Sequence, residues 1–497
     1  MSATNASTHP LPSFLQNGPK RLLIDGQWVA AASGATISTF NPANGQPIAE
    51  LARGDAEDID RAVKAARRAF EGEWSRFKPY DRQRLFMRVH DLVDKHFDEL
   101  AHLETLDMGA PLARTQSLKG WLSQALMFYG AQSQTLAGQT LPNSLPGRFT
   151  TYTIKAPVGV VGGIIPWNGP LISQWWVLGP VLATGCTLVL KPSEEASLSV
   201  LRMAELLLEA GLPPGVVNVV TGLGGEAGSA LAQHRGVDRV AFTGSTETAR
   251  KIVTASTSNM KRLQMELGGK SPDIVFADAD LDAAVPGAGM AAFNNSGQIC
   301  FAGTRLLVQR SIHTEFVDRL VQFSKTLRLG DGMNSDTQLG PLISKKQLDR
   351  VLHYVEIGSR EGATLAAGGK RLGGELSEGY FVEPTVFSGV DNQMTIAREE
   401  IFGPVVVVIP FDDADDALRI ANETDYGLGS AVWTRDINTM LKMTQGIQAG
   451  TVWVNCYGAL DPSIGFGCHR MSGYGIKGGP QHVEGYMYPK TVYIKES

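Results

Sequence analysis

Apolar and polar residues alternate along much of the first fifty residues of the chain. Two such stretches, RLLIDGQWVAA (21–31) and ATISTFNPANGQPIAEL (35–51), carry an Asp-Gly or an Asn-Gly pair between their alternating halves. Both pairs accept the positive φ angles that two-residue hairpin turns require. The pattern therefore predicts antiparallel hairpins at the start of the chain.

Apolar residues recur every three or four positions in the two segments that follow. This spacing predicts helices with one buried stripe. The segments are DIDRAVKAARRAF (58–70) and YDRQRLFMRVHDLVDKHFDELAHLET (80–105).

From Thr151 onward, short apolar runs alternate with helical stretches, the clearest of which is SLSVLRMAELLLEAG (197–211). Repetition of strand, helix and strand predicts a parallel sheet covered on both faces. Ligands of such sheets bind beyond the carboxyl ends of the strands, where PWNGP, KPSE and TGSTE fall. The predicted strands lie in GVVGGIIPW (159–167), TLVLKPS (187–193), VVNVVTG (216–222) and RVAFTGS (239–245).

A second alternation of strands and helices begins near Ser271, with helices up to Asn295 and through Phe323. We predict a second α/β domain here, so that the fold class of the whole chain is α/β. The last strand-like piece, TVYIKES (491–497), is expected at a sheet edge of this chain or of a neighbouring subunit. The strands of the second domain are predicted in SPDIVF (271–276), TRLLVQ (304–309), GPVVVVIPF (403–411), SAVW (430–433) and GTVWVN (450–455).

Length, charge and cysteine content narrow the function classes. At 497 residues the chain is too long for one ordinary core, so two or three structural units are expected. Its 45 basic and 50 acidic residues form no long run of one sign, which argues against a nucleic-acid partner. Four cysteines without zinc-type spacing predict reduced thiols and no metal site. The N-terminal stretch MSATNASTHPLPSFLQNGPK lacks the pattern of a signal or transit peptide. No apolar stretch is long enough to span a bilayer. We therefore expect a soluble cytoplasmic protein without a membrane partner.

Two stretches compete as the binding site of a dinucleotide phosphate. GLGGEA (222–227) fits G-x-G-x-x-A and follows an apolar run, whereas FTGSTETA (242–249) has one glycine but also joins a strand to a helix. Either helix start could offer free N–H groups to an anion. A tight turn without a ligand explains each glycine equally well.

The KPSE stretch follows the predicted strand TLVL. Lys191 and Glu194 could therefore face one crevice, where a carboxylate is a usual partner of ribose hydroxyls. The alternative is a helix-capping cluster of Ser193 with Glu194 and Glu195.

Cys300 lies in NNSGQICFAG, between small and polar residues and just before a predicted strand. A free cysteine is most often a small buried hydrophobe. Glu266, which interrupts an apolar run before two glycines that would let the chain turn sharply, is a candidate partner, and Asn168 adds an amide donor. A thiol, a carboxylate and an amide suit covalent catalysis on a carbonyl, in which the thiol attacks, the amide stabilises the oxyanion and the carboxylate activates water.

At these residues the chain resembles the NAD(P)-dependent aldehyde dehydrogenase superfamily. The resemblance rests on IIPWN, KPSE, AFTGST, MELGGKSP, GQICFAG, EEIFGPV and GTVWVN, in the family's order, and runs from about LIDGQW to TVYIKES. It implies three structural parts: a Rossmann-like cofactor domain (1–130 and 151–265), an α/β catalytic domain (266–465), and a small β segment (131–150 and 478–497) that bridges subunits in homodimers or homotetramers.

The resemblance also implies the roles of site residues. Cys300 would be the nucleophile and Glu266 the general base. Asn168 and the Cys300 backbone N–H would form the oxyanion hole. An aldehyde would pass through a thiohemiacetal and a thioester to a free carboxylic acid. Nearby N–H donors should favour the Cys300 thiolate. The implied cofactor is NAD rather than NADP, because Glu194 would repel a 2′-phosphate. Its implied binding residues are Ile165, Trp167, Lys191, Ser193, Glu194, Gly225, Gly244, Ser245, Leu267, Gly268, Glu400 and Phe402, which favours TGST over GLGGEA for the phosphates.

Departures from the family pattern bear on the substrate. Gly169 and Asn294 stand where relatives often carry aromatic rings, while Trp176, Phe301, Leu460 and Phe466 remain large and apolar, which predicts a wide pocket for a bulky aromatic or long-chain aldehyde. Alternatives are an acyl-CoA-forming dehydrogenase, against which Glu266 argues, and a non-catalytic binding or structural protein on the same scaffold.

Further departures are Ala249, Cys468 and Ile476-Lys477, the last standing where Arg-Glu is frequent. Ala249 could change how closely a helix start approaches the phosphates. We expect Cys186, Cys456 and Cys468 to be packing residues, and His469 with Arg470 to lie at a surface or an interface.

Overall fold

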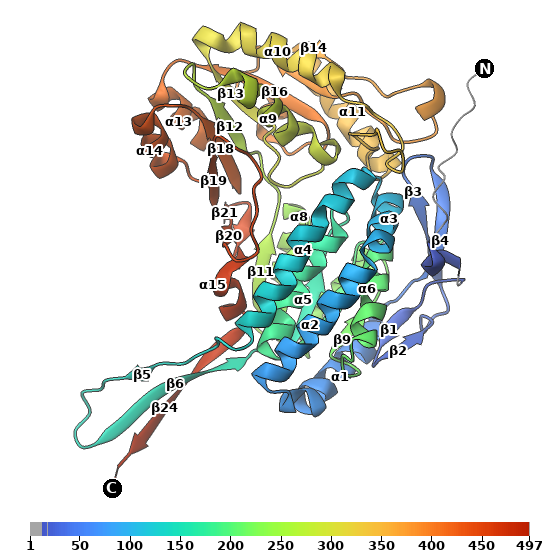
Figure 1. Ribbon diagram of the computed structural model, residues 1–497, viewed down its shortest axis with the longest axis vertical. Helices are drawn as coiled ribbons and strands as arrows, with labels where there is room; N and C mark the ends of the chain where they lie inside the picture. The colour runs from blue at the N-terminus through green and yellow to red at the C-terminus, as the bar shows by residue number, and fades with distance from the viewer. Residues whose placement is uncertain (1–11, 17, 497) are drawn as a thin grey trace.

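The structure is a computed structural model that describes residues 12–16 and 18–496. Most of residues 1–20, which lack the pattern of a targeting signal, therefore lie outside the described residues. No helix within the described ranges combines the length and the apolar character that crossing a membrane requires. The chain forms a mixed α/β fold with two large sheets and a projecting β arm (Figure 1).

The first large sheet has eight strands in the order β2-β1-β9-β8-β7-β10-β11-β22, and its five central strands run parallel. The four strands predicted between residues 159 and 245 are thereby confirmed. The strands are β1 (Leu22–Ile24), β2 (Gln27–Val29), β7 (Val160–Ile164), β8 (Thr187–Lys191), β9 (Val217–Val219), β10 (Arg239–Thr243), β11 (Arg262–Glu266) and β22 (Gly473–Tyr474).

Helices cover both faces of this sheet, and an apolar core fills each side. One side is packed by α2 (Pro79–Lys95), α3 (Phe97–Met108), α4 (Leu112–Gln132), α5 (Pro170–Thr184) and α6 (Leu198–Glu209) (Figure 1). The other side is packed by α1 (Ala56–Glu71), α7 (Ser229–Gln233) and α8 (Thr246–Ala255).

The two predicted hairpins are confirmed. Strand β1 pairs with β2 through Asp25 and Gly26, whose φ angles of 54° and 74° are those of a tight turn with two left-handed residues. Strand β3 (Thr36–Asn41) pairs antiparallel with β4 (Gln46–Ala52).

The helical segment predicted over 80–105 is two helices rather than one. His96 leaves the helical region at φ −105° and ψ 13°, so α2 ends at Lys95 and α3 begins at Phe97. The break lets Phe97, Leu100 and Leu103 of α3 enter the core at a new angle, which the apolar spacing could not indicate.

The second large sheet has the order β14-β15-β16-β13-β12-β18-β19, and all its pairings are parallel except that of β14 with β15. This confirms the predicted second α/β unit. Its strands are β12 (Pro272–Val275), β13 (Arg305–Gln309), β14 (Thr364–Ala367), β15 (Thr385–Ser388), β16 (Val405–Phe411), β18 (Gly429–Trp433) and β19 (Thr451–Val454).

Helices also cover both faces of the second sheet. One core is packed by α9 (Leu281–Phe293) and α10 (His313–Thr326). The other is packed by α11 (Lys345–Arg360), α12 (Thr395–Arg398), α13 (Ala414–Asn422) and α14 (Ile437–Gly446).

A three-stranded sheet, β24-β6-β5, forms the arm that projects from the body (Figure 1). Its strands are β5 (Thr140–Leu141), β6 (Phe149–Pro157) and β24 (Met487–Lys495). The predicted C-terminal strand thus pairs with β6 of its own chain, in register from Met487↔Pro157 to Lys495↔Phe149, rather than only with a neighbour. The outer edge of β24 has no partner strand among the described residues. The division of the chain into domains remains a prediction.

Short strands near the C-terminus tie the two large sheets together. They are β17 (Tyr426–Gly427), β20 (Phe466–Gly467), β21 (His469–Arg470) and β23 (Ile476–Lys477), followed by α15 (Gly479–Glu484). Strand β20 pairs with β23, and β17 pairs with β21. The chain therefore passes from the second sheet back to β22, which pairs with β11 of the first.

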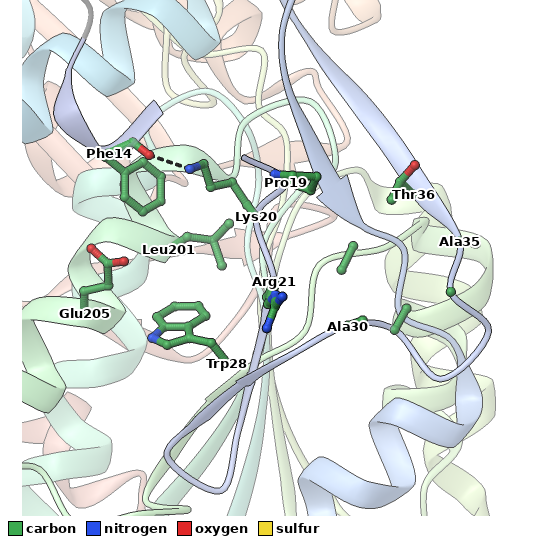
Figure 2. A pocket seen from close by; sticks show the side chains of 13 residues that line it. Phe14, Pro19, Lys20, Arg21, Trp28, Ala30, Ala35, Thr36, Leu201 and Glu205 are labelled. Atoms are coloured by element: carbon green, nitrogen blue, oxygen red, sulfur yellow. Dashed lines mark hydrogen bonds between the residues drawn. The ribbon is translucent and has the colours of Figure 1, made fainter. Parts of the chain in front are cut away.

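A cavity of about 420 Å³ lies between the N-terminal hairpin and α6. Figure 2 shows Phe14, Trp28 and Leu201 around it, with Lys20 donating a hydrogen bond to the Phe14 carbonyl. None of the predicted site residues lines this cavity. The predicted site residues thus lie away from this cavity.

Candidate active site

The loop that carries Cys300 has a backbone of unusual conformation. Asn295, Ser296 and Gly297 have φ angles of 55°, 53° and 71°, three left-handed residues in succession. Non-glycine residues adopt this region at a cost that the surrounding structure must offset.

Side-chain hydrogen bonds hold the loop in this conformation. Asn295 Nδ2 donates to the Asn168 carbonyl at 3.1 Å, and Ser296 Oγ donates to the Gly340 carbonyl at 2.6 Å. Gln298 Nε2 donates to the Asn295 carbonyl, while its Oε1 accepts from the Ile343 N–H at 2.9 Å. The loop is therefore fixed at several points before the chain reaches the cysteine.

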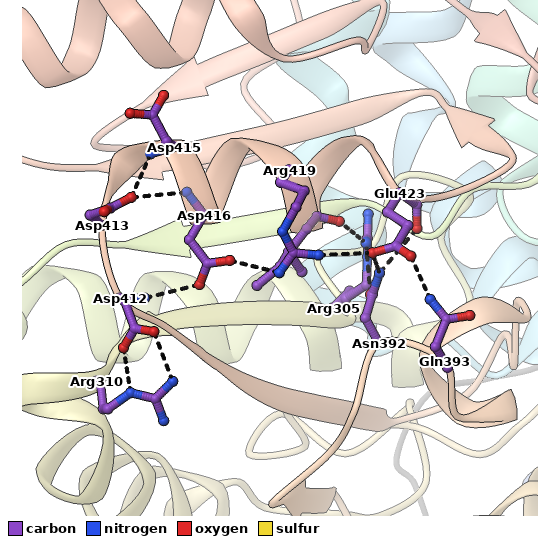
Figure 3. A network of polar contacts seen from close by, with 11 residues as sticks. Arg305, Arg310, Asn392, Gln393, Asp412, Asp413, Asp415, Asp416, Arg419 and Glu423 are labelled. Carbon is purple, nitrogen blue, oxygen red and sulfur yellow. Dashed lines mark hydrogen bonds and ion pairs between the residues drawn. The ribbon is translucent and has the colours of Figure 1, made fainter.

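Arg305 anchors the other end of the cysteine loop, at the start of β13. Its buried guanidinium donates to Asn392 Oδ1 and to the carbonyls of Ile420 and Ala421, at 2.7–3.0 Å. Asn392 in turn donates to Glu423, so the loop end is held by a polar network that extends to the surface (Figure 3).

Asn168 lies between β7 and α5, close to the cysteine loop. Its Nδ2 donates to the Gln298 carbonyl at 2.9 Å, two residues before Cys300. An amide carries two hydrogens on this nitrogen, so one remains for a second acceptor.

Glu266 is the last residue of β11 and is 2% exposed. Its Oε1 accepts no hydrogen bond. Burial raises the pKa of this carboxyl to about 7, against an opposing effect of Lys477. A carboxyl with this pKa exchanges protons near neutrality, as a general base must.

One N–H donor, the Phe301 backbone, does favour the Cys300 thiolate, but other effects outweigh it. Burial and the neighbouring Glu266 raise the pKa of this thiol to about 12, and only the Lys477 charge and the Phe301 backbone N–H lower it. Cys300 is therefore held as a neutral thiol beside a carboxyl that can take its proton.

The two glycines after Glu266 act by close approach rather than by a sharp turn, because neither has a positive φ. A Cβ on Gly268 would collide with the Glu400 carboxylate, and one on Gly269 would lie 2.7 Å from the Cys300 carbonyl oxygen. Glu400 Oε1 accepts from the Gly269 N–H at 3.2 Å, and burial raises its pKa to about 7. The MELGGK stretch thus brings Glu266, Glu400 and the cysteine loop together.

Lys191 and Glu194 do face each other beyond the end of β8, as an ion pair at 2.7 Å. Burial acts to raise the pKa of Glu194, but Lys191 and hydrogen bonds lower it below its ordinary value. The capping alternative does not describe α6, whose N-cap is Ser197 and whose Leu198 N–H is bound by Asp107. A Cβ at nearby Gly225 would meet nothing within 4 Å, so the backbone here faces open space.

The two candidate phosphate stretches begin helices of different length. Ser245 caps the ten-residue α8 and accepts from the Thr248 N–H at 3.3 Å. Gly222–Ala227 instead leads into a short π-helical turn, Gly224–Gly228, where the Gly224 N–H donates to Glu194 at 3.2 Å. Only the first offers the start of a regular helix. Ala249, in the first turn of α8, is buried in the apolar core.

Most of the remaining cofactor candidates follow the ends of β7, β8, β10 and β11, and Phe402 precedes β16. The Trp167 and Phe402 rings meet edge to face at 5.3 Å, and Phe402 has a left-handed φ of 60°. The backbone N–H groups of Ile165, Gly244 and Leu267 donate to the carbonyls of Lys191, Glu266 and Ser472, respectively. The Ser193 side-chain hydroxyl accepts from the Glu195 N–H.

Three of the apolar candidates lie at the reactive end of the site. Phe301, Leu460 and Phe466 belong to the cluster that Cys300 contacts, and the Phe301 and Phe466 rings lie 5.6 Å apart. The fourth, Trp176, meets Trp121 edge to face at 4.9 Å and lies close to Gly478. A Cβ at Gly169 would meet nothing within 4 Å, and Asn294 is half-buried at the end of α9.

Several residues that position the site escaped the sequence analysis. Buried Glu104 of α3 accepts from the Leu171 N–H at 2.7 Å, and Asp107 from the Leu198 N–H at 2.8 Å. These carboxyls cap α5 and α6, the helices that follow the Asn168 and KPSE stretches. The sequence signal for these caps is the presence of acidic residues in an otherwise apolar stripe of α3.

The other cysteines differ from one another. Cys186 is buried, Cys468 is half-buried with its Sγ 3.5 Å from the Met265 carbonyl, and Cys456 is exposed, so its predicted packing role is wrong. His469 and Arg470 lie on the surface. Within the described residues, no three His, Cys, Asp or Glu side chains are grouped to hold a metal ion.

Comparison with known proteins gives a consistent picture. A model of the aldehyde dehydrogenase family matches residues 28–492. The mitochondrial aldehyde dehydrogenase of Homo sapiens is 45% identical over 479 residues, 96% of this chain and 92% of its own length. The mitochondrial benzaldehyde dehydrogenase of Antirrhinum majus is 43% identical over 475 residues, covering 95% and 88%. The NAD⁺ complex structure of an aldehyde dehydrogenase from Bacillus cereus superposes with a TM-score of 0.95 at 44% identity, covering 97% of this chain and 98% of the other.

Proposed function

The chain belongs to the aldehyde dehydrogenase family, and from this premise we propose that it is an NAD-dependent aldehyde dehydrogenase (EC 1.2.1.-) that oxidises a bulky aromatic or long-chain aldehyde to the free carboxylic acid. The observation that carries the proposal is the buried Glu266 carboxyl beside the Cys300 thiol.

In the first step, Glu266 takes the Cys300 proton and the sulfur adds to the aldehyde carbon. The carbonyl oxygen becomes an oxyanion, which the Asn168 side-chain N–H and the Cys300 backbone N–H stabilise. NAD, when bound, supplies the acceptor for the hydride that leaves the tetrahedral carbon. Collapse of the oxyanion then leaves a thioester on Cys300.

Glu266 then releases the proton from Cys300 to solvent and is again a carboxylate. In the second step it removes a proton from water, and the resulting hydroxide attacks the thioester. The Cys300 sulfur leaves with the bonding electrons and recovers a proton, so the net reaction consumes aldehyde, NAD⁺ and water and gives acid, NADH and a proton. Hydrolysis by this base supports a free acid rather than an acyl-CoA product.

Residues at or just after the ends of β7, β8, β10 and β11, together with residues just before the start of β16, would hold NAD. Lys191 and Glu194 suit the hydroxyls of a ribose, the start of α8 at Ser245 suits the pyrophosphate, and Glu400 with Phe402 suits the nicotinamide end. The Glu194 carboxylate would repel a 2′-phosphate, so NAD is preferred over NADP. The remaining members of this set are Ile165, Trp167, Ser193, Gly225, Gly244, Leu267 and Gly268.

Three observations support a bulky substrate. Gly169 leaves open space at the start of α5, Asn294 replaces an aromatic ring by a shorter side chain, and Phe301, Leu460, Phe466 and Trp176 provide apolar walls. A relative at 43% identity is named benzaldehyde dehydrogenase. The unpaired edge of β24 in the projecting arm supports association into a homodimer or homotetramer through strand addition.

The test is NADH formation by the purified protein with aryl, long-chain and short aldehydes, each with NAD or NADP. We expect the highest kcat/KM with bulky aldehydes and NAD, no effect of coenzyme A on the product, and loss of activity in Cys300→Ala. Faster oxidation of acetaldehyde than of every bulky aldehyde would contradict the substrate class. An acyl-CoA product would favour the acylating alternative, and NAD binding without turnover would favour a binding protein.

A further inference from the structure

Lys477 is a buried lysine close to the candidate catalytic residues. It ends β23, pairs in register with Phe466 of β20, and is 8% exposed. Its Nζ donates to Thr243 Oγ1 at 2.9 Å. Thr243 in turn is the register partner of Glu266 on the neighbouring strand β11.

The acidic groups around Lys477 converge from separate elements. Glu266 comes from β11, Cys300 from the loop before β13, and Cys468 from the turn after β20, and each interacts with the Lys477 charge. Glu400 adds a further negative charge near Cys300. Within the described residues, Lys477 is the one cation found to act on Glu266 and on both thiols.

The remaining titratable neighbour is His482 of α15, whose Nδ1 lies 3.1 Å from the Gly478 N–H and 3.0 Å from the Tyr129 hydroxyl. Burial and the charges of Arg239 and Lys477 lower the pKa of His482 well below its ordinary value. This histidine is therefore neutral near pH 7 and adds no second positive charge.

We propose that Lys477 is a positioning residue of the dehydrogenase: from its bond to Thr243, its ammonium stabilises the Glu266 carboxylate and the Cys300 thiolate as each forms. This inference rests on the proposed function. Its physical basis is that a charge in a site largely removed from water acts strongly over several ångströms, because little solvent screens it. Glu266 needs such a charge, because its Oε1 accepts no hydrogen bond that would stabilise the anion.

The proposal predicts coupled changes when the charge is removed. In Lys477→Met, which keeps an apolar stem of similar length, both the thiol and the carboxyl should ionise at higher pH. Loss of a buried charge several ångströms away should raise each pKa by about one unit. A rise of about one unit in the thiol pKa lowers the thiolate fraction at neutral pH by about tenfold. Lys477→Arg retains the charge and should restore most of the wild-type behaviour.

The first measurement is the rate at which iodoacetamide alkylates Cys300 in the full-length protein across pH 6–9, followed by peptide mass spectrometry. Alkylation proceeds through the thiolate and needs no turnover. We expect Lys477→Met to react about tenfold more slowly than the wild type and Lys477→Arg to react within about twofold of it. Lys325→Met, which removes an exposed lysine on α10, is the matched control and should react at the wild-type rate.

The second measurement is the pH dependence of kcat for the same variants. In Lys477→Met, the acidic limb of the kcat–pH profile should move to higher pH by about one unit. In Lys477→Arg and Lys325→Met it should stay where it is in the wild type. A folded Lys477→Met with unchanged alkylation and an unchanged acidic limb would overturn the proposal. If that variant does not fold, Lys477→Gln serves the same purpose. If no aldehyde is oxidised, the proposed function fails, but the alkylation profile still decides whether Lys477 stabilises the thiolate.

Discussion

At the scale of single residues, desolvation sets the chemistry of this site. Burial is the main cause of the raised pKa of Glu266, Cys300 and Glu400, and no hydrogen bond to Glu266 Oε1 offsets it. The result is a carboxyl poised near neutrality and a thiol that stays protonated until a base removes its proton. The two groups therefore form a functional pair, in which Glu266 serves both halves of the proposed reaction.

Glu266→Gln should separate these halves. Glutamine keeps the size of the side chain but cannot accept the proton of the attacking water, so thioester hydrolysis should slow by at least about 100-fold. If acylation can still proceed at high pH, rapid mixing should show a burst of about one NADH per subunit, with a thioester adduct visible by mass spectrometry.

The control for this substitution is Glu356→Gln on the exposed face of α11, which should keep the wild-type steady state. Complete loss of both burst and steady state at every pH would mean that Glu266 is indispensable for forming the thiolate. A wild-type rate of hydrolysis would mean that another group activates the water.

At the scale of elements, the site depends on loops held in costly conformations by rigid neighbours. Three successive left-handed residues precede Cys300, and bonds to Asn168, Gly340 and Ile343 hold them. Buried carboxyls of α3 cap α5 and α6 in a similar way. The helices and strands thus act as the frame that holds the strained cysteine loop in place.

Gly297→Ala should disrupt this arrangement. Gly297 has a φ of 71°, and a Cβ there would collide with the Gly403 carbonyl. We expect the free energy of unfolding to fall by more than about 2 kcal/mol, together with loss of dehydrogenase activity. Urea unfolding and steady-state assays would measure the two effects.

Gly373→Ala is the matched control, because Gly373 has an ordinary φ and a Cβ there would meet nothing within 4 Å. It should change stability by less than about 0.5 kcal/mol. Equal effects of the two substitutions would show that the left-handed backbone and close packing at Gly297 are not what the loop requires.

At the scale of the whole molecule, five buried carboxyls share one property. Burial raises the pKa of Glu104, Asp107, Glu266, Asp273 and Glu400 to about 7. Between the ordinary carboxyl range and about pH 7, the folded protein therefore binds more protons than the unfolded chain. Stability must then decrease as pH rises through this window.

We expect the thermal midpoint to fall between pH 5 and pH 7. Lys270, whose pKa burial lowers to about 7, acts in the opposite direction only above that pH. His482 and His313, whose pKa values burial lowers, oppose the fall below about pH 6.5, but two imidazoles do not outweigh five carboxyls. Differential scanning fluorimetry at half-unit steps would follow the midpoint. Glu104→Gln, which retains an oxygen to accept from the Leu171 N–H, should make the fall shallower, and a midpoint that rises from pH 5 to 7 would contradict the prediction.

Some errors of the sequence reading have clear physical causes. The break at His96 was missed because apolar spacing continues through it, and the helix caps Glu104 and Asp107 were missed because their partners lie more than sixty residues away. The MELGGK glycines were interpreted as turn residues, whereas the structure needs them where Glu400 and the Cys300 carbonyl approach the backbone.

The sequence by itself determined the order and type of most elements, the parallel sheets and the family, because periodicity, turn residues and motif order are local properties. The tertiary structure decided which charges meet. It placed Lys477 against Thr243, the register partner of Glu266, and brought the partly buried Cys300 thiol close to the Glu266 carboxyl. Ionisation depends on distance and burial between residues far apart in the chain, and a one-dimensional pattern contains neither quantity.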